Sequence, residues 1–356
     1  MTTSQVAPRA TAALAAAAKG GAGRLAAIDS LRGVAALAVV VFHYTTQFMK
    51  LYGAADTPSL SFAWGGYLGV NLFFIISGFV IFMTLERTRS AMDFVVSRLS
   101  RLFPAYWAAV ALTFAVVSFA GLPGKEVSAW HAVANLIMVH GLLNVPHVDS
   151  VYWSLEVEML FYAAMLALFV SGQLRRVHVF LCLLLALRVF YDVSSKHFGV
   201  DLSWTLARLL NLTHLPWFAL GICIYQATRA GGSGSRGAIG LTAALAIGTL
   251  AWIEGWVVAS LAAALALWVW AAAGGRARWL ENPLLAFFGL ISYPLYLVHE
   301  HIGWVVQRAV LARGGSMDQG IAVAFVVVVV LAAMLTFGVE RPAMRAIRAR
   351  YAKRRS

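Results

Sequence analysis

The sequence predicts an all-α membrane protein with about ten transmembrane helices, and three observations support this prediction. Of its 356 residues, 61% are hydrophobic and 12% charged, whereas a soluble domain carries about 45–50% apolar and about 25% charged residues. The mean hydropathy is +0.78. Long apolar stretches recur along the chain, and the basic residues gather in alternate gaps between them. This composition excludes a water-soluble enzyme, a disordered chain and a disulfide scaffold.

The spans follow from stretches long enough to cross a bilayer. A helix needs roughly 20 residues to cross about 30 Å of hydrocarbon. Ten stretches reach or approach this length: residues 33–49, 66–85, 102–120, 151–170, 178–192, 204–226, 238–253, 256–273, 284–311 and 320–338. The fifth is short. For the long segment 121–150, the sequence leaves open an interfacial helix over Trp130–Leu143 or a partial eleventh crossing.

The charges predict the orientation. With the N-terminus in the cytoplasm, the inner segments hold 21 of the 28 Lys and Arg residues, and the outer segments hold only 4. The positive-inside rule therefore predicts that both termini are cytoplasmic. The net charge of +13 then belongs to the inner loops, and we expect no nucleic-acid partner. Cys182 and Cys223 lie in apolar stretches and are expected to be small core residues without a disulfide.

The domain organisation is expected to be simple. A single membrane domain over residues 28–343 follows an Ala- and Gly-rich tail, residues 1–27, which is expected to be disordered or interfacial. A basic cytoplasmic tail, residues 344–356, comes after it. Gly231–Gly237 is expected to be a flexible cytoplasmic linker. The sequence shows no internal repeat and no large soluble domain.

The first span carries two ionisable residues, which are costly in hydrocarbon and therefore point to function. Arg32 and His43 are 11 residues apart, about three turns at about 100° per residue, with a rise of about 16 Å. One helix face thus carries Arg32 at the inner end and His43 about halfway or more across. Imidazole can take a proton from a hydroxyl near neutral pH. The alternative is a neutral histidine hydrogen-bonded to a neighbouring helix.

Two further groups stand at the entrances of the third and fourth spans. Arg98 and Arg101 share a helix face at the inner side, where they can grip phosphates or act as an ordinary membrane anchor. From the outer side, Ser154 and Glu158 share one face of the fourth span, and Glu158 is expected to line a cavity. Glu156 points elsewhere and is expected to be wet. The side chains of Tyr152 and Trp153 fit an interfacial aromatic belt.

The ninth span carries a polar stripe. Ser292, Tyr296 and His299 recur at helical spacing beside Tyr293, which indicates a cavity wall or a seam of hydrogen bonds between helices. The following Glu300 and a second histidine do not complete a zinc-binding HExxH pattern, so no metal is expected. The Gly-rich residues 65–78 are apolar, and close helix packing explains them better than phosphate binding.

Together these clusters resemble acyltransferase family 3, the multi-span O-acyltransferases typified by O-antigen acetylases. The resemblance runs in family order from about residue 27 to 343. The matching segments are DSLRGVAALAVVVFHY with its Arg-x10-His pattern, GVNLFFIISGF, the Arg98 and Arg101 pair, YWSLEVE, SYPLYLVH, and the Glu340-Arg341-Pro342 motif after the last span. The fused extracytoplasmic SGNH domain of some relatives has no counterpart here, and we expect the stand-alone form.

The resemblance implies transfer of an acyl group, commonly acetyl from acetyl-CoA, to a hydroxyl of an envelope or exported carbohydrate or glycolipid at the bacterial inner membrane. It makes His43 the inferred catalytic residue, with Arg32 of the same motif and Glu158 of the YWSLEVE motif as further candidate catalytic residues. It assigns Arg98 and Arg101 to the coenzyme A phosphates.

The expected mechanism combines topology with this resemblance. Acyl-CoA docks at the basic inner face, the acceptor enters from outside past Tyr152 and Trp153, and His43 acts as general base between them. Glu158 is a candidate for orienting either His43 or the acceptor. A covalent acyl intermediate on His43 is the competing route. The rival class is a proton-coupled transporter or flippase, which also uses buried His, Glu and Arg residues.

Overall fold

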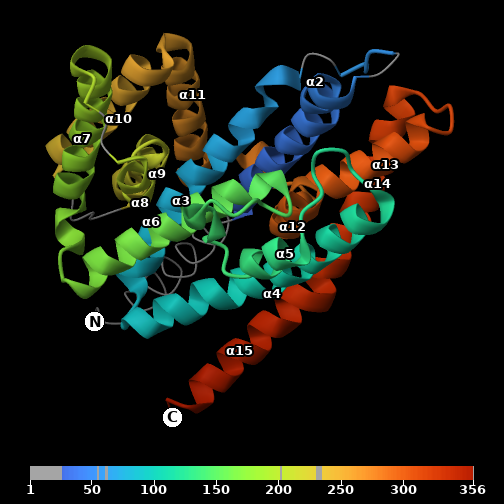
Figure 1. Cartoon of the computed structure of the whole chain (residues 1–356). Coiled ribbons are helices and arrows are strands. Elements are labelled where there is room, and N and C mark those ends of the chain that lie inside the picture. The colour runs from blue at the N-terminus through green and yellow to red at the C-terminus, as the bar shows by residue number, and fades with distance from the viewer. Residues whose placement is uncertain (1–25, 54–55, 61–62, 201–202, 230–234, 356) are drawn as a thin grey trace, which may run out of the picture.

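Helices make up the protein. The computed structural model describes residues 26–53, 56–60, 63–200, 203–229 and 235–355, and within these ranges the regular secondary structure is entirely helical (Figure 1). Hydrocarbon offers no hydrogen-bond partners to a backbone, and a helix satisfies its own amide and carbonyl groups. The all-α prediction is confirmed. Nearly all of the predicted N-terminal tail and most of the predicted glycine linker lie outside the described residues.

All ten predicted stretches correspond to apolar helices among the described residues. Eight of these helices are long and apolar enough to span a membrane: Ala26–Tyr52, Gly65–Arg87, Ala91–Ala120, Ser150–Val170, Leu174–Phe198, Arg236–Glu254, Trp256–Ala273 and Met317–Lys353. Two are shorter: α9 (Leu215–Thr228) and α12 (Pro283–Val298). The chain is therefore a multi-pass membrane protein. The orientation with both termini in the cytoplasm stays a prediction, and "inner" and "outer" below follow it.

Within these spans the labelled helices have defined bounds. From the N-terminus they are α2 (Phe48–Tyr52), α3 (Leu68–Arg87), α4 (Ala91–Ala120), α6 (Trp153–Val170), α7 (Val177–Phe198), α10 (Arg236–Glu254), α11 (Trp256–Ala273), α14 (Met317–Leu335) and α15 (Arg341–Lys353). Two predicted spans are divided. The sixth begins with the short α8 (Trp204–Leu209) before α9, and the ninth bends at His299 between α12 and α13 (Glu300–Leu311).

The segment before α6 differs from its prediction. Instead of a continuous helix over Trp130–Leu143, it forms α5 (Ala129–Asn135) and a separate 3-10 turn, His140–Leu143. The helix ends because Met138 adopts a positive φ of 61°, a left-handed conformation that cannot continue a right-handed helix. Within the described residues this segment contains no eleventh crossing helix.

The helices form two groups with α3 and α6 between them (Figure 1). In one group α9 packs against α3, α10 and α11, and α7 packs against α10. In the other, α12 and α13 pack against α14 and α4. The first helix, Ala26–Tyr52, contacts both α3 and α12, since Gly69 meets the Ala35 carbonyl and Gly289 meets the Asp29 carbonyl. This central position brings its polar residues into the protein interior.

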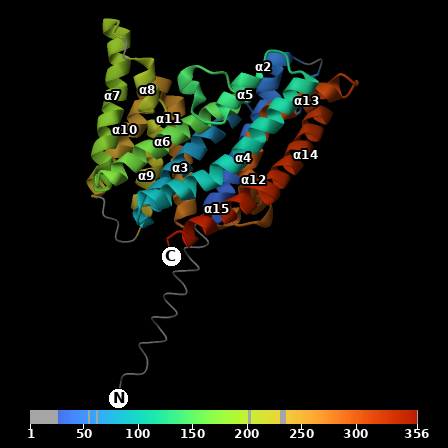
Figure 2. The same ribbon diagram turned by 60° about the horizontal axis from the view of Figure 1, so that its bottom comes forward.

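The basic C-terminal segment is a helix and lies along the inner end of α4 (Figure 2). Arg348 donates hydrogen bonds to the Ser100 hydroxyl at 3.2 Å and the Ser97 carbonyl at 3.1 Å. The Tyr351 hydroxyl donates to the Asp93 carboxylate at 2.9 Å. The basic C-terminal residues thus add positive charge beside the predicted arginine pair at the start of α4.

Close approach of α3 and α9 depends on two glycines. A Cβ on Gly78 would meet the Phe218 carbonyl, and a Cβ on Gly221 would meet the Ile75 carbonyl. Because backbone atoms line both contacts, neither helix can yield by turning a side chain. The predicted role of the glycine-rich residues 65–78 in helix packing is confirmed.

We therefore expect Gly221→Ala to lower the melting temperature of the detergent-purified protein, because overpacking of this kind typically costs about 1–3 kcal/mol. Gly248→Ala in α10 is the matched control, since a Cβ there meets nothing within 4 Å. Thermal unfolding followed by tryptophan fluorescence measures both. Equal melting temperatures for the two variants would contradict this account of the α3–α9 contact.

Candidate active site

A cavity with about 710 Å³ of empty space, partly open to solvent, lies among the first helix, α3, α4, α6 and α12. It brings together eight residues that the sequence analysis singled out, although they come from four separate motifs. These residues are Arg32, Arg98, Arg101, Ser154, Glu158, Ser292, Tyr293 and Tyr296. We call it the inner cavity, because the arginines of the inner membrane face form one end of it.

The charged lining of the inner cavity is mostly basic. Arg32 comes from the first helix, within 3.9 Å of Asp29, and Arg98 and Arg101 come from α4. The Nε atom of Arg98 is buried and has no hydrogen-bond partner. Three guanidinium groups facing one carboxylate of the lining give a cavity that attracts anions.

Glu158 is that carboxylate. Its Oε1 accepts hydrogen bonds from the Ser77 hydroxyl at 2.7 Å and the Tyr162 hydroxyl at 2.6 Å. These bonds hold the carboxylate toward the inner cavity, beside the arginines. Among the described residues no hydrogen bond or ion pair joins Glu158 to His43, and it is the Glu300 carboxylate that faces that imidazole, at 3.7 Å. Glu158 had two candidate roles, orienting His43 or orienting the acceptor, and the geometry disfavours the first.

The inner cavity ends at the polar stripe of α12. Tyr296 and Ser154 join their hydroxyls at 2.6 Å, and the Tyr296 ring packs edge-on against Phe73 with 5.8 Å between centroids. Tyr293 donates to the Leu102 carbonyl at 2.9 Å. The Ser292 hydroxyl donates to the Gly289 carbonyl within its own helix at 2.8 Å. The stripe is therefore both a cavity wall and a hydrogen-bonded seam.

His43 lies beyond this wall, at the start of a π-helical turn, His43–Gln47. Such a turn contains one more residue than an α-helical turn and is frequent at functional sites. The His43 carbonyl accepts from the Trp304 indole at 2.9 Å, and the Tyr44 carbonyl accepts from the Gln307 amide at 3.0 Å. The first helix is thus fixed to α13 where it carries the imidazole. The His43 side chain is 12% exposed.

The hydrogen bonds of His43 assign its tautomer. Its Nδ1 lies 2.8 Å from the Val39 carbonyl, which can only accept, so this nitrogen carries the proton. By the same reasoning the Nδ1 of His299 donates to the Tyr296 carbonyl at 2.8 Å. The Nε2 of His299 is then unprotonated and lies 3.2 Å from the Nδ1 of His43, so the one Nδ1 proton is shared between the nearer Val39 carbonyl and this nitrogen. This arrangement leaves the Nε2 of His43 with a free lone pair, as a base requires.

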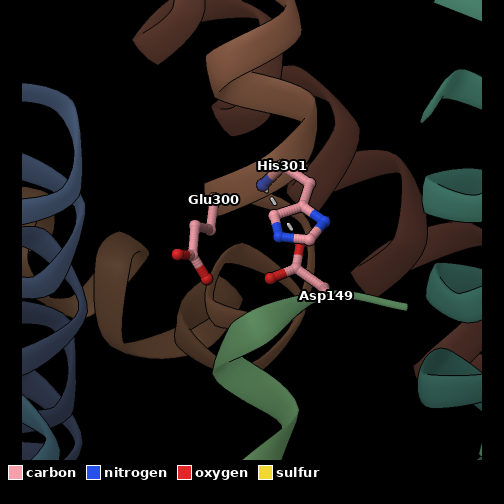
Figure 3. Close-up of side chains that lie close together, drawn as sticks. All are labelled: Asp149, Glu300 and His301. Atoms are coloured by element: carbon pink, nitrogen blue, oxygen red, sulfur yellow. Dashed lines mark hydrogen bonds between the residues drawn. The ribbon is translucent and has the colours of Figure 1, made fainter. Parts of the chain in front are cut away.

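A second polar cluster adjoins His43 on the outer side. Glu300, at the start of α13, places its Oε1 3.7 Å from the Nε2 of His43. Asp149 and His301 complete the group, and ligand-type atoms of the three side chains lie within 4.8 Å of one another (Figure 3). All three residues are buried. We call Asp149, Glu300 and His301 the outer cluster.

The YWSLEVE motif points in two directions. Tyr152 is fully buried, and its hydroxyl donates to the Leu297 carbonyl at 3.2 Å, so it supports α12 rather than facing a ligand. Trp153 is 38% exposed and lines a separate outer pocket of about 430 Å³ with Glu156 and Arg208. The expectation that Glu156 is wet is wrong: it is buried because it pairs with the Arg208 guanidinium from α8.

Two histidines border that ion pair. His140 and His147 join their rings at 2.7 Å, and both flank Gly141, whose carbonyl accepts from Arg208 at 3.0 Å. Burial, together with the charge of His147, lowers the pKa of His140 to about 4. Burial also lowers the pKa of His147. Near pH 7 the pair is therefore neutral, as its hydrogen bond requires.

Sequence reasoning missed the outer cluster and the role of Trp304. Asp149 lies in a loop about 150 residues from its partners, so no helical spacing connects them. Glu300 offered the one available signal, because a carboxylate directly follows the polar stripe of the ninth span. The residues of the four motifs that line the inner cavity or reach His43, by contrast, recur at helical spacing on one helix face, and the sequence predicts them.

Comparison with known proteins supports a single family. A family model described as an acyltransferase domain matches residues 25–339. The exopolysaccharide production protein ExoZ of Rhizobium meliloti is 28% identical over 320 residues, which are 84% of this chain and 96% of the relative.

Two further relatives match only in part. Peptidoglycan O-acetyltransferase OatA of Listeria monocytogenes is 28% identical over 38% of this chain and 22% of its own length. Acyltransferase MdmB of Streptomyces mycarofaciens is 29% identical over 39% of this chain and 38% of its own length. The chain thus aligns with less than half of either protein. No solved structure matches it.

Proposed function

The chain belongs to the membrane acyltransferase family whose domain it matches over nearly its whole length, and on this premise we propose that it is an O-acetyltransferase using cytoplasmic acyl-CoA. The acceptor is a hydroxyl of an envelope or exported carbohydrate or glycolipid, and the site is the bacterial inner membrane. One observation carries the proposal: an arginine-lined inner cavity ends beside a histidine pair within the membrane. Family membership favours this activity over a transporter.

Charge supports the donor assignment. Coenzyme A carries several phosphate charges, and Arg32, Arg98 and Arg101 give the inner cavity a basic end that attracts them. The buried, unpartnered Nε of Arg98 offers a donor that a phosphate oxygen would satisfy. Glu158, held by Ser77, lines the same cavity.

The tautomer of His43 supports its role as general base. Its free Nε2 takes the proton of the acceptor hydroxyl while the hydroxyl oxygen attacks the thioester carbonyl carbon. The carbon–sulfur bond then breaks, and the proton passes from Nε2 to the departing thiolate, which restores neutral imidazole. The bond from Nδ1 to the Val39 carbonyl holds the ring throughout.

An aromatic wall separates the inner cavity from His43, so the acyl donor needs an opening in this wall to reach the base. The rings of Phe73 and Tyr296 pack together at the cavity end, and Tyr296 lies 5.6 Å from the His299 ring, centroid to centroid. The acyl end of the donor reaches His43 only if this aromatic wall opens. Tyr296, whose hydroxyl bonds to the Ser154 hydroxyl at 2.6 Å and to the Val151 carbonyl at 3.1 Å, is the side chain that must move, and both bonds break when it does.

The acceptor is assigned to the outer side. The name of ExoZ links that relative to exopolysaccharide production, and OatA is named for peptidoglycan O-acetylation. Sugar rings stack on aromatic faces, and the partly exposed Trp153 offers such a face beside Arg208 in the outer pocket. The buried Tyr152 then acts by supporting its neighbours.

We expect His43→Ala to lower turnover by about 10²–10⁴-fold, the usual contribution of general-base catalysis. Acetylated product measured by mass spectrometry gives the rate, and thermal unfolding checks the fold. His197→Ala, which replaces an exposed histidine at the end of α7, is the control and should leave turnover unchanged. Turnover like that of the wild type in a folded His43→Ala protein would refute the role.

Ala substitution of Arg98 or Arg101 should raise the KM for acyl-CoA more than it lowers kcat, because the guanidinium groups bind the donor away from the reacting carbon. Initial rates at varied donor concentration measure both constants. Arg176→Ala, at an exposed inner position, is the matched control. An unchanged KM in both cavity variants would return the pair to a membrane-anchoring role.

A covalent route through His43 is tested separately. Direct transfer, the route proposed here, predicts that protein incubated with labelled acyl-CoA alone acquires no label on His43. Peptide mass spectrometry after rapid quenching measures this, with His43→Ala as the blank. A labelled His43 peptide that delivers its acyl group to added acceptor would establish the covalent route instead.

A further inference from the structure

We propose that Glu300 and Asp149 form a carboxyl pair that shares one proton and holds a single negative charge beside His43. This charge stabilises the imidazolium that forms when His43 accepts a proton, and Glu300 is the positioning residue that faces the ring. The inference rests on the proposed function of His43 as a base. It explains why a buried carboxylate follows the polar stripe of α12.

Geometry on the His43 side sets the role of Glu300. Its Oε1 lies 3.7 Å from the Nε2 of His43, the nitrogen that the tautomer leaves unprotonated. Two lone pairs face each other there in the resting state. A proton added to Nε2 converts this contact into an ion pair, which is stronger in a buried site than in water.

The contact between Glu300 and Asp149, on the side away from His43, requires a shared proton. The Oε2 of Glu300 is buried without a hydrogen-bond partner, and the carboxyl groups of Glu300 and Asp149 lie side by side (Figure 3). The Asp149 carboxylate accepts from the backbone amides of His301 at 3.1 Å and Val151 at 3.3 Å. Two buried carboxylates this close cannot both be charged unless something positive lies between them.

A proton fits this place better than a metal ion. The Nε2 of His301 is already bonded to the Ser150 hydroxyl at 2.9 Å and the Ser150 amide at 3.3 Å. The ammonium of Lys125 donates to the same hydroxyl at 3.1 Å and adds positive charge at the edge of the cluster. A proton needs only the two carboxyl groups.

Few charged and titratable groups surround His43, so variants that remove them one at a time should each shift its protonation in a known direction. His299 faces it from α12, Glu300 and His301 from α13, and Asp149 and Lys125 from the outer loop. Among these, the carboxyl pair alone carries negative charge. Removing that charge favours the neutral imidazole of His43, and confining it to the nearer carboxyl favours the imidazolium.

The test follows the acidic limb of kcat/KM against pH, which reports the protonation of the free base. Asp149→Asn confines the charge to Glu300 and should move the limb to higher pH. Glu300→Gln leaves the charge on the more distant Asp149 and should move it to lower pH. The double variant has no charge on the pair, so its acidic limb should lie at the lowest pH of the series, about one pH unit below that of the wild type, and its kcat should be about tenfold lower. The KM for acyl-CoA should not change.

The controls separate the possible failures. Glu254→Gln changes an exposed residue of α10 that belongs to neither the inner cavity nor the outer cluster, and it should leave the acidic limb unchanged. Thermal unfolding checks the fold of each variant. If Glu300→Gln fails to fold, Asp149→Asn alone decides through the direction of its shift. If the folded, active variants show the same acidic limb of kcat/KM as the wild type, the proposed carboxyl pair is wrong, but the role of His43 as general base still stands. If the wild-type protein transfers no acyl group from acyl-CoA, the proposed function itself is wrong.

Chelation tests the rival occupant of the pair. Treating the wild type with EDTA should leave kcat unchanged, since a proton and not a cation joins the two carboxyl groups. Loss of activity that added Mg²⁺ or Ca²⁺ restores would overturn the shared proton.

Discussion

Hydrocarbon supplies no hydrogen-bond partners, and this constraint shapes every polar part of the molecule. The first helix carries Arg32 and His43 into the interior, where other helices must satisfy both. Arg32 faces a cavity that holds Glu158, and His43 bonds to its own helix and to His299. Even the loosened backbone of the π-turn is paired, because Trp304 and Gln307 donate to its carbonyls. Function and folding thus use the same bonds.

The spans could be predicted because length and apolar content are local properties of a sequence. The inner cavity was predictable in its parts: Arg98 with Arg101 and Ser154 with Glu158 each repeat on one helix face. Their meeting in one cavity depends on how helices pack, which spacing along the chain does not encode. The structure supplies this through close contacts such as that of Gly78 with Phe218.

Where the sequence reasoning failed, a bend or a loop was responsible. A regular helical period assumes continuous backbone, yet the ninth span bends at His299 and the first widens at His43. Asp149 reaches α13 from a loop, so its partnership with Glu300 has no periodic signature. Glu156 was misjudged because its partner Arg208 lies on a short helix that the apolar pattern merged with α9.

The bend at His299 has an electrostatic consequence. It ends α12 and begins α13 inside the protein, where the Asp149 carboxylate accepts from the amide of His301 and Glu300 lies in the first turn of α13. Peptide dipoles give a helix a partial positive charge at its start and a partial negative charge at its finish. The start of α13 therefore favours the carboxyl groups, and the finish of α12 favours a cation at the histidines. An unbroken span would present neither pole at this place.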